Sequence, residues 1–200
     1  MKFTCTKTNF NNGINIALKA VPGKTTMPIL ECVVIEAKGD MVKLTTNDMQ
    51  LGIETKIPAE IEQDGIILVN AKMISEIVRR LPDDDVNFEV DENNNILLFC
   101  GKSKFNIPGI PHDEFPMLPK IEADKTIHIS QFTLKEMIRQ TIFSISDNES
   151  NNILTGELFE INGDEFKIAS LDLVRVSIRK IHLKESYDPI KVVIPGKTLS

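Results

Sequence analysis

Hydrophobic residues along this chain follow two patterns, one with helical spacing and one with the alternation of β-strands. Helical spacing predicts one helix over residues 9–21 and a second over residues 71–81. The apolar residues that define these helices are Phe10, Ile14 and Leu18 in the first, and Met73, Ile74, Ile77, Val78 and Leu81 in the second. Short β-type runs surround them, including residues 85–91, 95–100 and 102–107. Helices set among antiparallel strands predict an α+β fold.

An internal repeat with an offset of 124 residues sets the expected domain organisation. Between positions 29 and 48, seven residues are identical to those 124 positions later. These seven are Ile29, Leu30, Glu36, Gly39, Asp40, Lys43 and Asp48. The first helix also has a counterpart, at whose start Thr133 and Glu136 have the spacing of a capping box. We therefore expect two domains of one architecture, each built as a strand, a helix and several antiparallel strands.

Prolines at 108, 111, 116 and 119 mark an irregular stretch between the two copies. We place the first domain at residues 1–120, with a connector at about 108–124, and the second domain at residues 121–200. Position 200 in the second copy corresponds to position 76 in the first, which lies inside the second predicted helix. The expectation is one complete domain followed by the N-terminal part of a truncated second one.

Composition indicates a folded protein outside the membrane. Of the 200 residues, 42% are hydrophobic and 26% are charged, which is typical of globular domains. The longest apolar runs span four or five residues, whereas a membrane-spanning helix needs about 20, and there is no signal-peptide pattern. Three widely spaced cysteines favour a reducing, cytoplasmic location. The net charge of -6, taken alone, argues against a nucleic-acid partner.

The distribution of charge changes that picture, because bases lie on the predicted helices. Residues 1–30 contain lysines and no acid, whereas residues 81–100 contain six acids and no base. Lys72 and Arg79 are seven residues apart and share a helix face. Such a face is typical of a solvated surface, but repeat-related helices that each carry a base also favour contact with phosphates. With no Trp and one Tyr for base stacking, any such contact should be independent of sequence.

Residues that suggest catalysis lack the companions that catalysis needs. Gly-Lys-Thr occurs at 23–25 and 196–198, but neither copy has the earlier Gly of a phosphate-binding loop. Asp48 and Asp172 recur in the repeat without a nearby His, so we interpret them as turn-stabilising or helix-capping residues. The three histidines lack metal-ligand spacing, so neither a metal nor a cofactor is expected. The prediction is a protein that is not an enzyme.

Motifs in series resemble the bacterial DNA sliding clamp family, the beta subunit of DNA polymerase III. In family order, the motifs are Met1–Thr4, Thr26–Leu30, Leu44–Asp48, residues 69–82 and Phe115–Pro119. The resemblance covers the whole chain. It implies the DNA clamp fold, with three domains per subunit and two subunits closed head to tail into a ring lined by basic helices. It also implies that this chain lacks the third domain.

The resemblance assigns candidate sites residue by residue. It implies contact with DNA for Lys24, Lys72, Arg79, Asn148, Asn152 and Lys197. It implies half of a cleft for partner peptides at Leu154, Leu171, Leu173, Val174, Arg175 and Val176, where Leu173 and Val174 replace a Gly-His that is common in the family. It implies a dimer interface at the edge strand Lys102, Ser103, Lys104, Phe105, Asn106 and Ile107.

The function that the resemblance implies is a DNA replication processivity factor. The full-length protein would be a homodimeric ring that slides on double-stranded DNA without sequence preference. It would tether the DNA polymerase III alpha subunit, and meet the clamp loader, through linear peptide motifs. Two alternatives stay open from the residues alone. One is a peptide-binding adaptor that does not encircle DNA, and the other is a hydrolase that uses Asp48 or Asp172.

Overall fold

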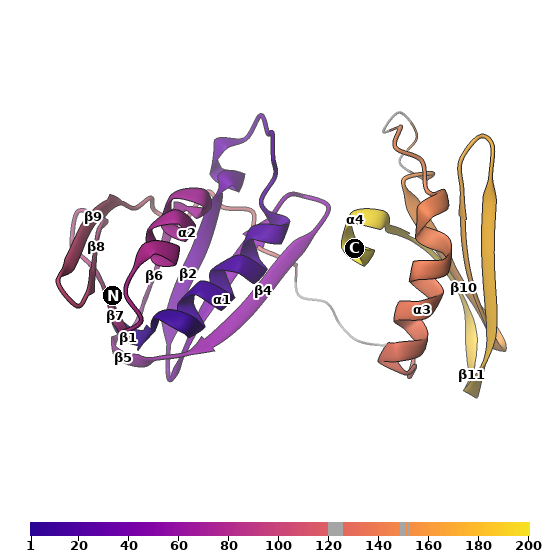
Figure 1. The fold of residues 1–200 in the computed structure, drawn as a ribbon, viewed down its shortest axis with the longest axis horizontal. Helices are drawn as coiled ribbons and strands as arrows, with labels where there is room; N and C mark the ends of the chain where they lie inside the picture. Colours follow the sequence, from indigo (N-terminus) through magenta and orange to yellow (C-terminus); the bar gives the residue numbers. More distant parts are fainter. Residues whose placement is uncertain (120–125, 149–150, 152) are drawn as a thin grey trace. The chain divides into compact units, whose positions relative to one another are not determined.

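A computed structural model describes residues 1–119, 126–148, 151 and 153–200 (Figure 1). The chain forms two compact units, Met1–Lys120 and Ile121–Ser200, which are described separately below. Among the described residues, none of the helices is both long and apolar enough to cross a lipid bilayer.

Unit 1 contains two antiparallel sheets and two main helices. In chain order its elements are β1 (Lys2–Thr6), α1 (Lys7–Ala17), the 3₁₀ turns η1 (Leu18–Ala20) and η2 (Pro28–Glu31), β2 (Cys32–Lys38), β3 (Met41–Asn47), β4 (Gly52–Pro58), β5 (Glu60–Gln63), β6 (Gly65–Asn70), α2 (Ala71–Arg80), β7 (Asp85–Val90), β8 (Asn95–Cys100) and β9 (Ser103–Pro108). The strand orders are β5-β1-β7-β8-β9 and β4-β3-β2-β6. Helices α1 and α2 lie side by side (Figure 1). The three strands expected between residues 85 and 107 are present, with ends shifted by one residue at most.

The core of unit 1 is built where the apolar faces of both helices meet both sheets. Phe10 and Ile14 from α1 and Ile74 from α2 are at most 1% exposed, as the helical spacing predicts. The rings of Phe3 and Phe88, on neighbouring strands, stack with centroids 4.8 Å apart, and Phe10 meets both edge-on. This aromatic cluster ties α1 to the five-stranded sheet.

Unit 2 repeats the helix and packs it on a sheet of two long antiparallel strands. Its elements are α3 (Gln131–Thr141), the 3₁₀ turn η3 (Ile142–Ser144), β10 (Gly156–Leu171), β11 (Val176–Pro195) and the short α4 (Gly196–Leu199). Strand β10 pairs antiparallel with β11 along its length, from Gly156 opposite Pro195 to Leu171 opposite Val176. Gly163 lies mid-strand at φ 62°, a conformation that favours glycine. Its counterpart Gly39, at φ 68°, forms the turn between β2 and β3.

Polar contacts recur 124 residues apart in the two units. Lys43 pairs with Glu36 across β3 and β2, and Lys167 pairs with Glu160 within β10. The ion pair within β10 therefore joins two halves of this strand that correspond to β2 and β3. The buried Thr46 hydroxyl donates to the Ala17 carbonyl at 2.6 Å. At the matching positions the Ser170 hydroxyl donates to the Thr141 carbonyl at 2.5 Å. The repeated α+β architecture of helices and antiparallel sheets is confirmed.

The start of the repeated helix differs from the sequence prediction in both units. Helix α1 begins at Lys7, and its N-cap Thr6 accepts a hydrogen bond from the Asn9 amide. Helix α3 begins at Gln131, so Thr133 and Glu136 lie inside it and the predicted capping box is wrong. The apolar spacing starts later than the helices do, because a first turn needs no buried side chain. Met73, expected in the apolar stripe of α2, is likewise 42% exposed.

Part of the predicted connector packs on unit 1. Phe115 is 4% exposed and contacts Cys32, Val34 and Leu68 on the four-stranded sheet. The side-chain amide of Asn47 donates to the Pro116 carbonyl at 2.8 Å. The first half of this proline-rich stretch thus covers one sheet face, whereas residues 120–125 lie outside the described part of the chain.

Candidate nucleic-acid interface and partner cleft

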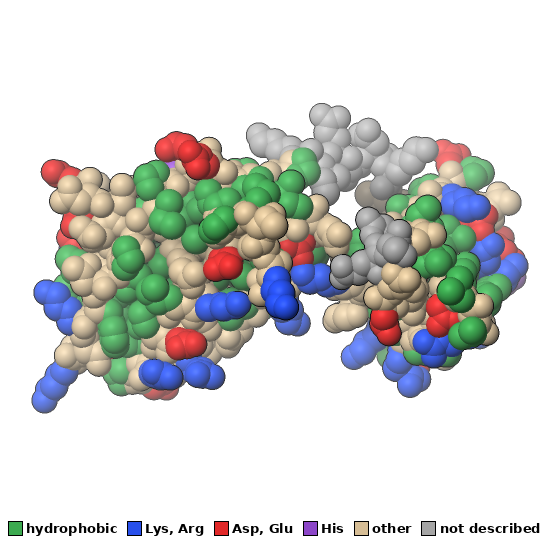
Figure 2. All heavy atoms as spheres, turned by 90° about the horizontal axis from the view of Figure 1, so that it is seen from above, with side chains coloured by type: hydrophobic (Ala, Val, Ile, Leu, Met, Phe, Trp, Pro, Cys, Tyr) green, Lys and Arg blue, Asp and Glu red, His purple; other side chains and the backbone are tan. Residues whose placement is uncertain are grey.

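The helices present exposed bases with few acids among them. Lys72 and Arg79 are both exposed on α2, away from the buried residues of that helix. Lys197 is exposed on α4. On α1 to α4, within their described bounds, the acidic residues are Glu76 and Glu136. The wider surface is mixed, because in Figure 2 Lys and Arg side chains project from each unit with Asp and Glu between them. Bases on helices are therefore local features of a surface that carries both signs.

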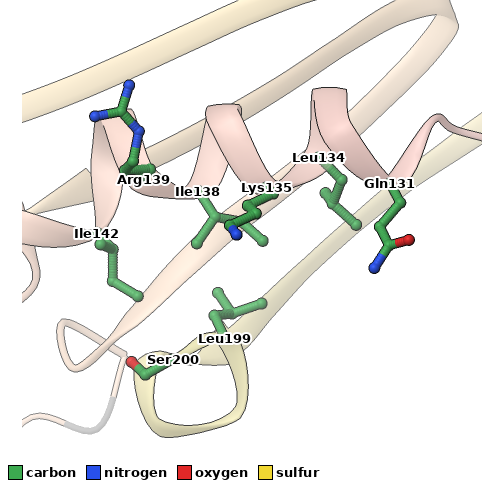
Figure 3. A pocket seen from close by; sticks show the side chains of 8 residues that line it. All are labelled: Gln131, Leu134, Lys135, Ile138, Arg139, Ile142, Leu199 and Ser200. Atoms are coloured by element: carbon green, nitrogen blue, oxygen red, sulfur yellow. The ribbon is translucent and has the colours of Figure 1, made fainter.

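Helix α3 adds two bases that the resemblance did not assign to DNA. Lys135 and Arg139 line an open groove of about 550 Å³ between α3 and the end of the chain (Figure 3). Its other lining residues are Gln131, Leu134, Ile138, Ile142, Leu199 and Ser200. Glu136 accepts two hydrogen bonds from the Arg139 guanidinium, at 3.1 and 2.8 Å, which lower the pKa of Glu136. Arg139 is thus already paired, whereas no acid lines the groove beside Lys135.

The remaining residues assigned to DNA lie in turns. Lys24 is exposed between η1 and η2. Asn148 is exposed after η3, and its amide donates to the Ser146 hydroxyl at 3.1 Å. Asn152 lies outside the described residues.

Five of the six residues assigned to the partner cleft lie in the exposed turn between β10 and β11 or at the strand ends beside it. Leu173 is 91% exposed and Val174 is 89% exposed, which is unusual for branched apolar side chains. Val176 and Ile178 continue the apolar surface along β11, each more than half exposed. Ile178 is not among the residues assigned to the cleft, although the alternation Val176-Ser177-Ile178 places its side chain on the same strand face as Val176.

The sixth residue, Leu154, is brought to the same end of unit 2. Its carbonyl accepts a hydrogen bond from the Ser146 amide at 2.8 Å. The nearby Ser144 hydroxyl lies 2.5 Å from the Ser177 hydroxyl at the start of β11. The segment after α3 therefore contacts both Leu154 and the first residues of β11.

The repeated aspartates stabilise turns, as predicted. Asp48 Oδ1 accepts hydrogen bonds from the amides of Gln50 and Leu51, at 3.0 and 2.6 Å. Asp172 Oδ1 accepts from the amides of Val174 and Arg175, at 2.8 and 2.9 Å. These backbone donors, led by the Val174 amide and joined by the Arg175 side chain, lower the pKa of Asp172.

The residues assigned to the dimer interface lie at a sheet edge. Strand β9 is one of the two edge strands of the five-stranded sheet and pairs with β8 on one side. Lys104 and Asn106 are exposed, Phe105 is half-buried and Ile107 is 2% exposed. Lys102 is exposed in the turn before Ser103, the first residue of the strand. Lys104 Nζ also lies 5.1 Å from the centroid of the Phe99 ring, a cation–π contact.

A buried carboxyl was not anticipated from the sequence. Glu157 is fully buried, and in the described part of the chain neither of its carboxylate oxygens has a hydrogen-bond partner. Burial raises the pKa of Glu157. The Thr141 hydroxyl lies near enough to lower this pKa in part, but its proton is directed to the Met137 carbonyl, at 2.9 Å, and not to the Glu157 carboxylate. In unit 1 the matching position is Val33, which is 1% exposed.

Groups that could bind a metal or react as nucleophiles are sparse in the described residues. No cluster of three or more His, Cys, Asp or Glu side chains is found there. Cys5, Cys32 and Cys100 are buried free thiols, and burial raises the pKa of Cys5 to about 12. Residues 196–198 of the second Gly-Lys-Thr lie in α4.

Comparison with known proteins identifies the class. Residues 1–119 match the family described as DNA polymerase III beta subunit, N-terminal domain, and residues 128–200 match the central domain of the same subunit. The chain therefore belongs to the DNA polymerase III beta subunit family, the beta sliding clamps.

Similar proteins are longer than this chain. It is 39% identical to the beta sliding clamp of Bacillus subtilis and 36% identical to that of Halalkalibacterium halodurans, in each case over the whole of this chain. It covers 55% and 56% of their lengths. The chain is also 54% identical to a DNA polymerase III beta subunit from Eubacterium rectale that has a crystal structure. The two structures superpose with a TM-score of 0.95, and this chain covers 55% of the length of that protein. The chain thus spans about half the length of these relatives.

Proposed function

We propose that this chain is the N-terminal part of a DNA replication processivity factor. The complete protein is a homodimeric ring that encircles double-stranded DNA and keeps the replicative polymerase on its template in the bacterial cytoplasm. The observation that carries this proposal is the pair of repeated helix–sheet units whose helices carry exposed bases, in a chain that belongs to the beta sliding clamp family. The role is topological and non-catalytic, because a closed ring cannot leave duplex DNA sideways.

The DNA-facing residues in this proposal are Lys24, Lys72, Arg79, Asn148, Asn152 and Lys197. The exposed lysines and arginine attract phosphates at long range and read no bases, which suits a ring that must slide. Binding should weaken steeply as salt rises, because released counterions supply much of the free energy. Lys135 joins this set, since it lies exposed on the repeat-related helix α3.

The partner cleft is formed in part by Leu154 and the turn Leu171–Val176. Exposed apolar side chains on a fixed turn favour a short peptide with apolar side chains over a charged ligand. In the proposal these peptides belong to the DNA polymerase III alpha subunit and the clamp loader.

Completion of the ring needs a third domain and a second subunit. The edge strand β9 is available for pairing with the third domain of a second subunit, because among the described strands it pairs with β8 alone. This chain covers 55% of the length of the Bacillus subtilis beta sliding clamp, which fits the same proposal.

Retention of the full-length protein on circular and on linear DNA tests encirclement. We expect the protein, once loaded, to stay on nicked circular DNA at high salt and to leave within seconds when a restriction enzyme linearises the circle. Equal retention on circular and on linear DNA would contradict the proposal. A peptide-binding adaptor, favoured by the exposed Leu173–Val174 tip alone, would still bind the alpha subunit but show no dependence on DNA topology.

A further inference from the structure

We infer that Asp172 is a positioning residue of the partner cleft, which holds the Leu173–Val174 tip and the Arg175 side chain in the arrangement that a partner peptide meets. The inference deepens the proposed function and rests on it, since it concerns the same turn. It assigns a role to a carboxylate that itself need not touch the peptide.

The geometry closes the turn on the Asp172 carboxylate. Oδ1 accepts from the amides of Val174 and Arg175, and Oδ2 accepts from Arg175 Nε at 2.7 Å. The Asp172 amide in turn donates to the Arg175 carbonyl at 3.1 Å. Four hydrogen bonds therefore constrain a turn of four residues. The bond from Arg175 Nε to Asp172 Oδ2 joins two charged groups, which makes it a strong one.

These bonds hold two apolar side chains out in water. Leu173 and Val174 are about nine-tenths exposed. The hydrogen bonds from the Val174 and Arg175 amides to Asp172 Oδ1 fix the backbone of the turn, so these side chains cannot fold back to become buried while the bonds are present. Fixing the turn before binding reduces the conformational entropy that a partner would otherwise have to overcome. The tip is thus ready to meet an apolar side chain.

Arg175 is oriented by the same carboxylate. Its Nε is occupied by Asp172 Oδ2, whereas its side chain remains 52% exposed. A guanidinium has five N–H donors, so the terminal nitrogens can reach the carbonyls of a peptide lying along the tip. Asp172 thereby sets the direction of the donors as well as the position of the apolar surface.

Unit 1 provides a turn with the same aspartate spacing but with a leucine where unit 2 has Arg175. Asp48 accepts from the amides of Gln50 and Leu51 with the same spacing, but Leu51 stands where unit 2 has Arg175. The residues at the tip are Met49 and Gln50 in place of Leu173 and Val174. The backbones also differ, because Met49 has φ 73° and Leu173 is not in the left-handed region. Substitution of Asp48 therefore removes the same amide contacts from a turn that lies outside the cleft.

The occupant that fits is a short peptide segment with a large apolar side chain. The apolar surface continues from the tip through Leu171 and Val176 to Ile178, each at least 45% exposed. No acidic side chain other than Asp172 lies within the turn, and that one is engaged by Arg175. The surface therefore favours an apolar peptide over a basic one.

The test measures binding of the purified DNA polymerase III alpha subunit to the full-length clamp by surface plasmon resonance. We expect Asp172→Ala to weaken binding about tenfold, because the turn loses three acceptor contacts. Asp172→Asn keeps an acceptor oxygen but loses the charge opposite Arg175, so it should weaken binding about threefold. Asp48→Ala is the control and should leave the affinity unchanged.

Hydrogen exchange supplies a readout that affinity alone does not give. In Asp172→Ala the amides of Val174 and Arg175 should exchange faster, and Asp172→Asn should restore most of their protection. Equal weakening by Asp172→Ala and Asp48→Ala would overturn the inference, because it would reflect stability alone. Unchanged affinity in Asp172→Ala would overturn it too, whatever the exchange rates.

Val176→Asp separates failure of the inference from failure of the proposed function. This substitution puts a charge into the apolar surface itself and should abolish binding. If Val176→Asp weakens binding and Asp172→Ala does not, the cleft stands and the positioning role falls. If the alpha subunit binds Val176→Asp as tightly as the unaltered protein, the cleft itself is wrong.

Discussion

Unit 1 and unit 2 share a helix packed on an antiparallel sheet, but unit 1 adds a five-stranded second sheet, whereas the described part of unit 2 has the one sheet formed by β10 and β11. In unit 1, Phe3, Phe10 and Phe88 pack together, and Phe88 comes from β7 of that second sheet. In unit 2 the positions of Phe3 and Phe10 are held by Ile127 and Leu134. Both line an apolar cavity of about 260 Å³. The repeated half of the architecture therefore sets the topology, whereas the second sheet completes the core.

The largest expected effect is at the aromatic cluster of unit 1. Phe88→Ala removes a fully buried ring that contacts two others and should cost about 3–5 kcal/mol of stability. Phe132→Ala, at a site that is 75% exposed, is the control and should change the stability of either unit by less than about 0.5 kcal/mol. Hydrogen exchange in urea, read separately for peptides of each unit, measures both. If Phe88→Ala also destabilised unit 2 to the same degree, the two cores would not be independent.

The second prediction concerns the carboxyl at the position where unit 1 has Val33. Glu157→Met keeps the volume and removes a buried polar group without partners, so it should stabilise unit 2 by about 1–3 kcal/mol at pH 7. Urea unfolding of the variant and the unaltered chain measures the difference. Destabilisation would mean that the carboxyl has an ordered partner in solution.

Glu157 also makes the stability of unit 2 depend on pH in a way that the matching Val33 of unit 1 does not. Its pKa is raised in the folded unit, so above its ordinary value of 4.5 the unfolded chain releases this proton first. Unit 2 should lose stability as pH rises from about 4.5 until the folded-state pKa is passed. Glu157→Gln should remove this loss while retaining the separate acid sensitivity of Asp172, whose lowered pKa makes its contribution disappear as pH falls. A slope unchanged by Glu157→Gln would contradict the assignment.

A smaller effect is expected at the hydroxyl that ties each first helix to its sheet. Thr46→Val and Ser170→Ala each remove one buried hydrogen bond to a helix carbonyl and should each cost about 1–2 kcal/mol, in unit 1 and unit 2 respectively. Thermal unfolding followed by exchange in each unit compares them directly. A markedly larger loss in one unit would show that the repeat is not energetically equivalent at this contact.

The smallest effect is expected at the repeated ion pairs. Lys43→Met in unit 1 and Lys167→Met in unit 2 remove partly exposed pairs with Glu36 and Glu160, and each should cost less than about 1 kcal/mol. The cost should shrink further at high salt, because screening weakens exposed pairs. A larger, salt-independent loss would indicate that the lysine stems act through packing.

Much of the fold could be predicted because its signals are local or repeated. The spacing of Phe10 and Ile14 follows from helix geometry, and the 124-residue offset located the second copy of the same elements. Asp48 and Asp172 could be interpreted as turn residues since an aspartate bonds amides two and three positions ahead. The first turns of α1 and α3 escaped prediction because they bury little apolar surface.

The candidate site was harder, because exposure and burial depend on partners far along the chain. Leu173 and Val174 are of residue types that are usually buried, and they are exposed because they lie in the turn between β10 and β11. Glu157 is of a residue type that is usually exposed, but it lies on the same face of β10 as Phe159 and Ile161, which packs toward the core of unit 2. Phe115 covers a sheet although its proline-rich segment has the pattern of a solvated connector.

By itself the sequence determined the repeat, the α+β class and the family, since each rests on residue order and short-range spacing. Only the tertiary structure decided how Asp172 engages Arg175, which sheet face Phe115 covers, and that Glu157 is buried without a partner among the described residues. The physical reason is range. Helical and strand periodicity act over a few residues, whereas burial depends on contacts between segments that are distant in the sequence.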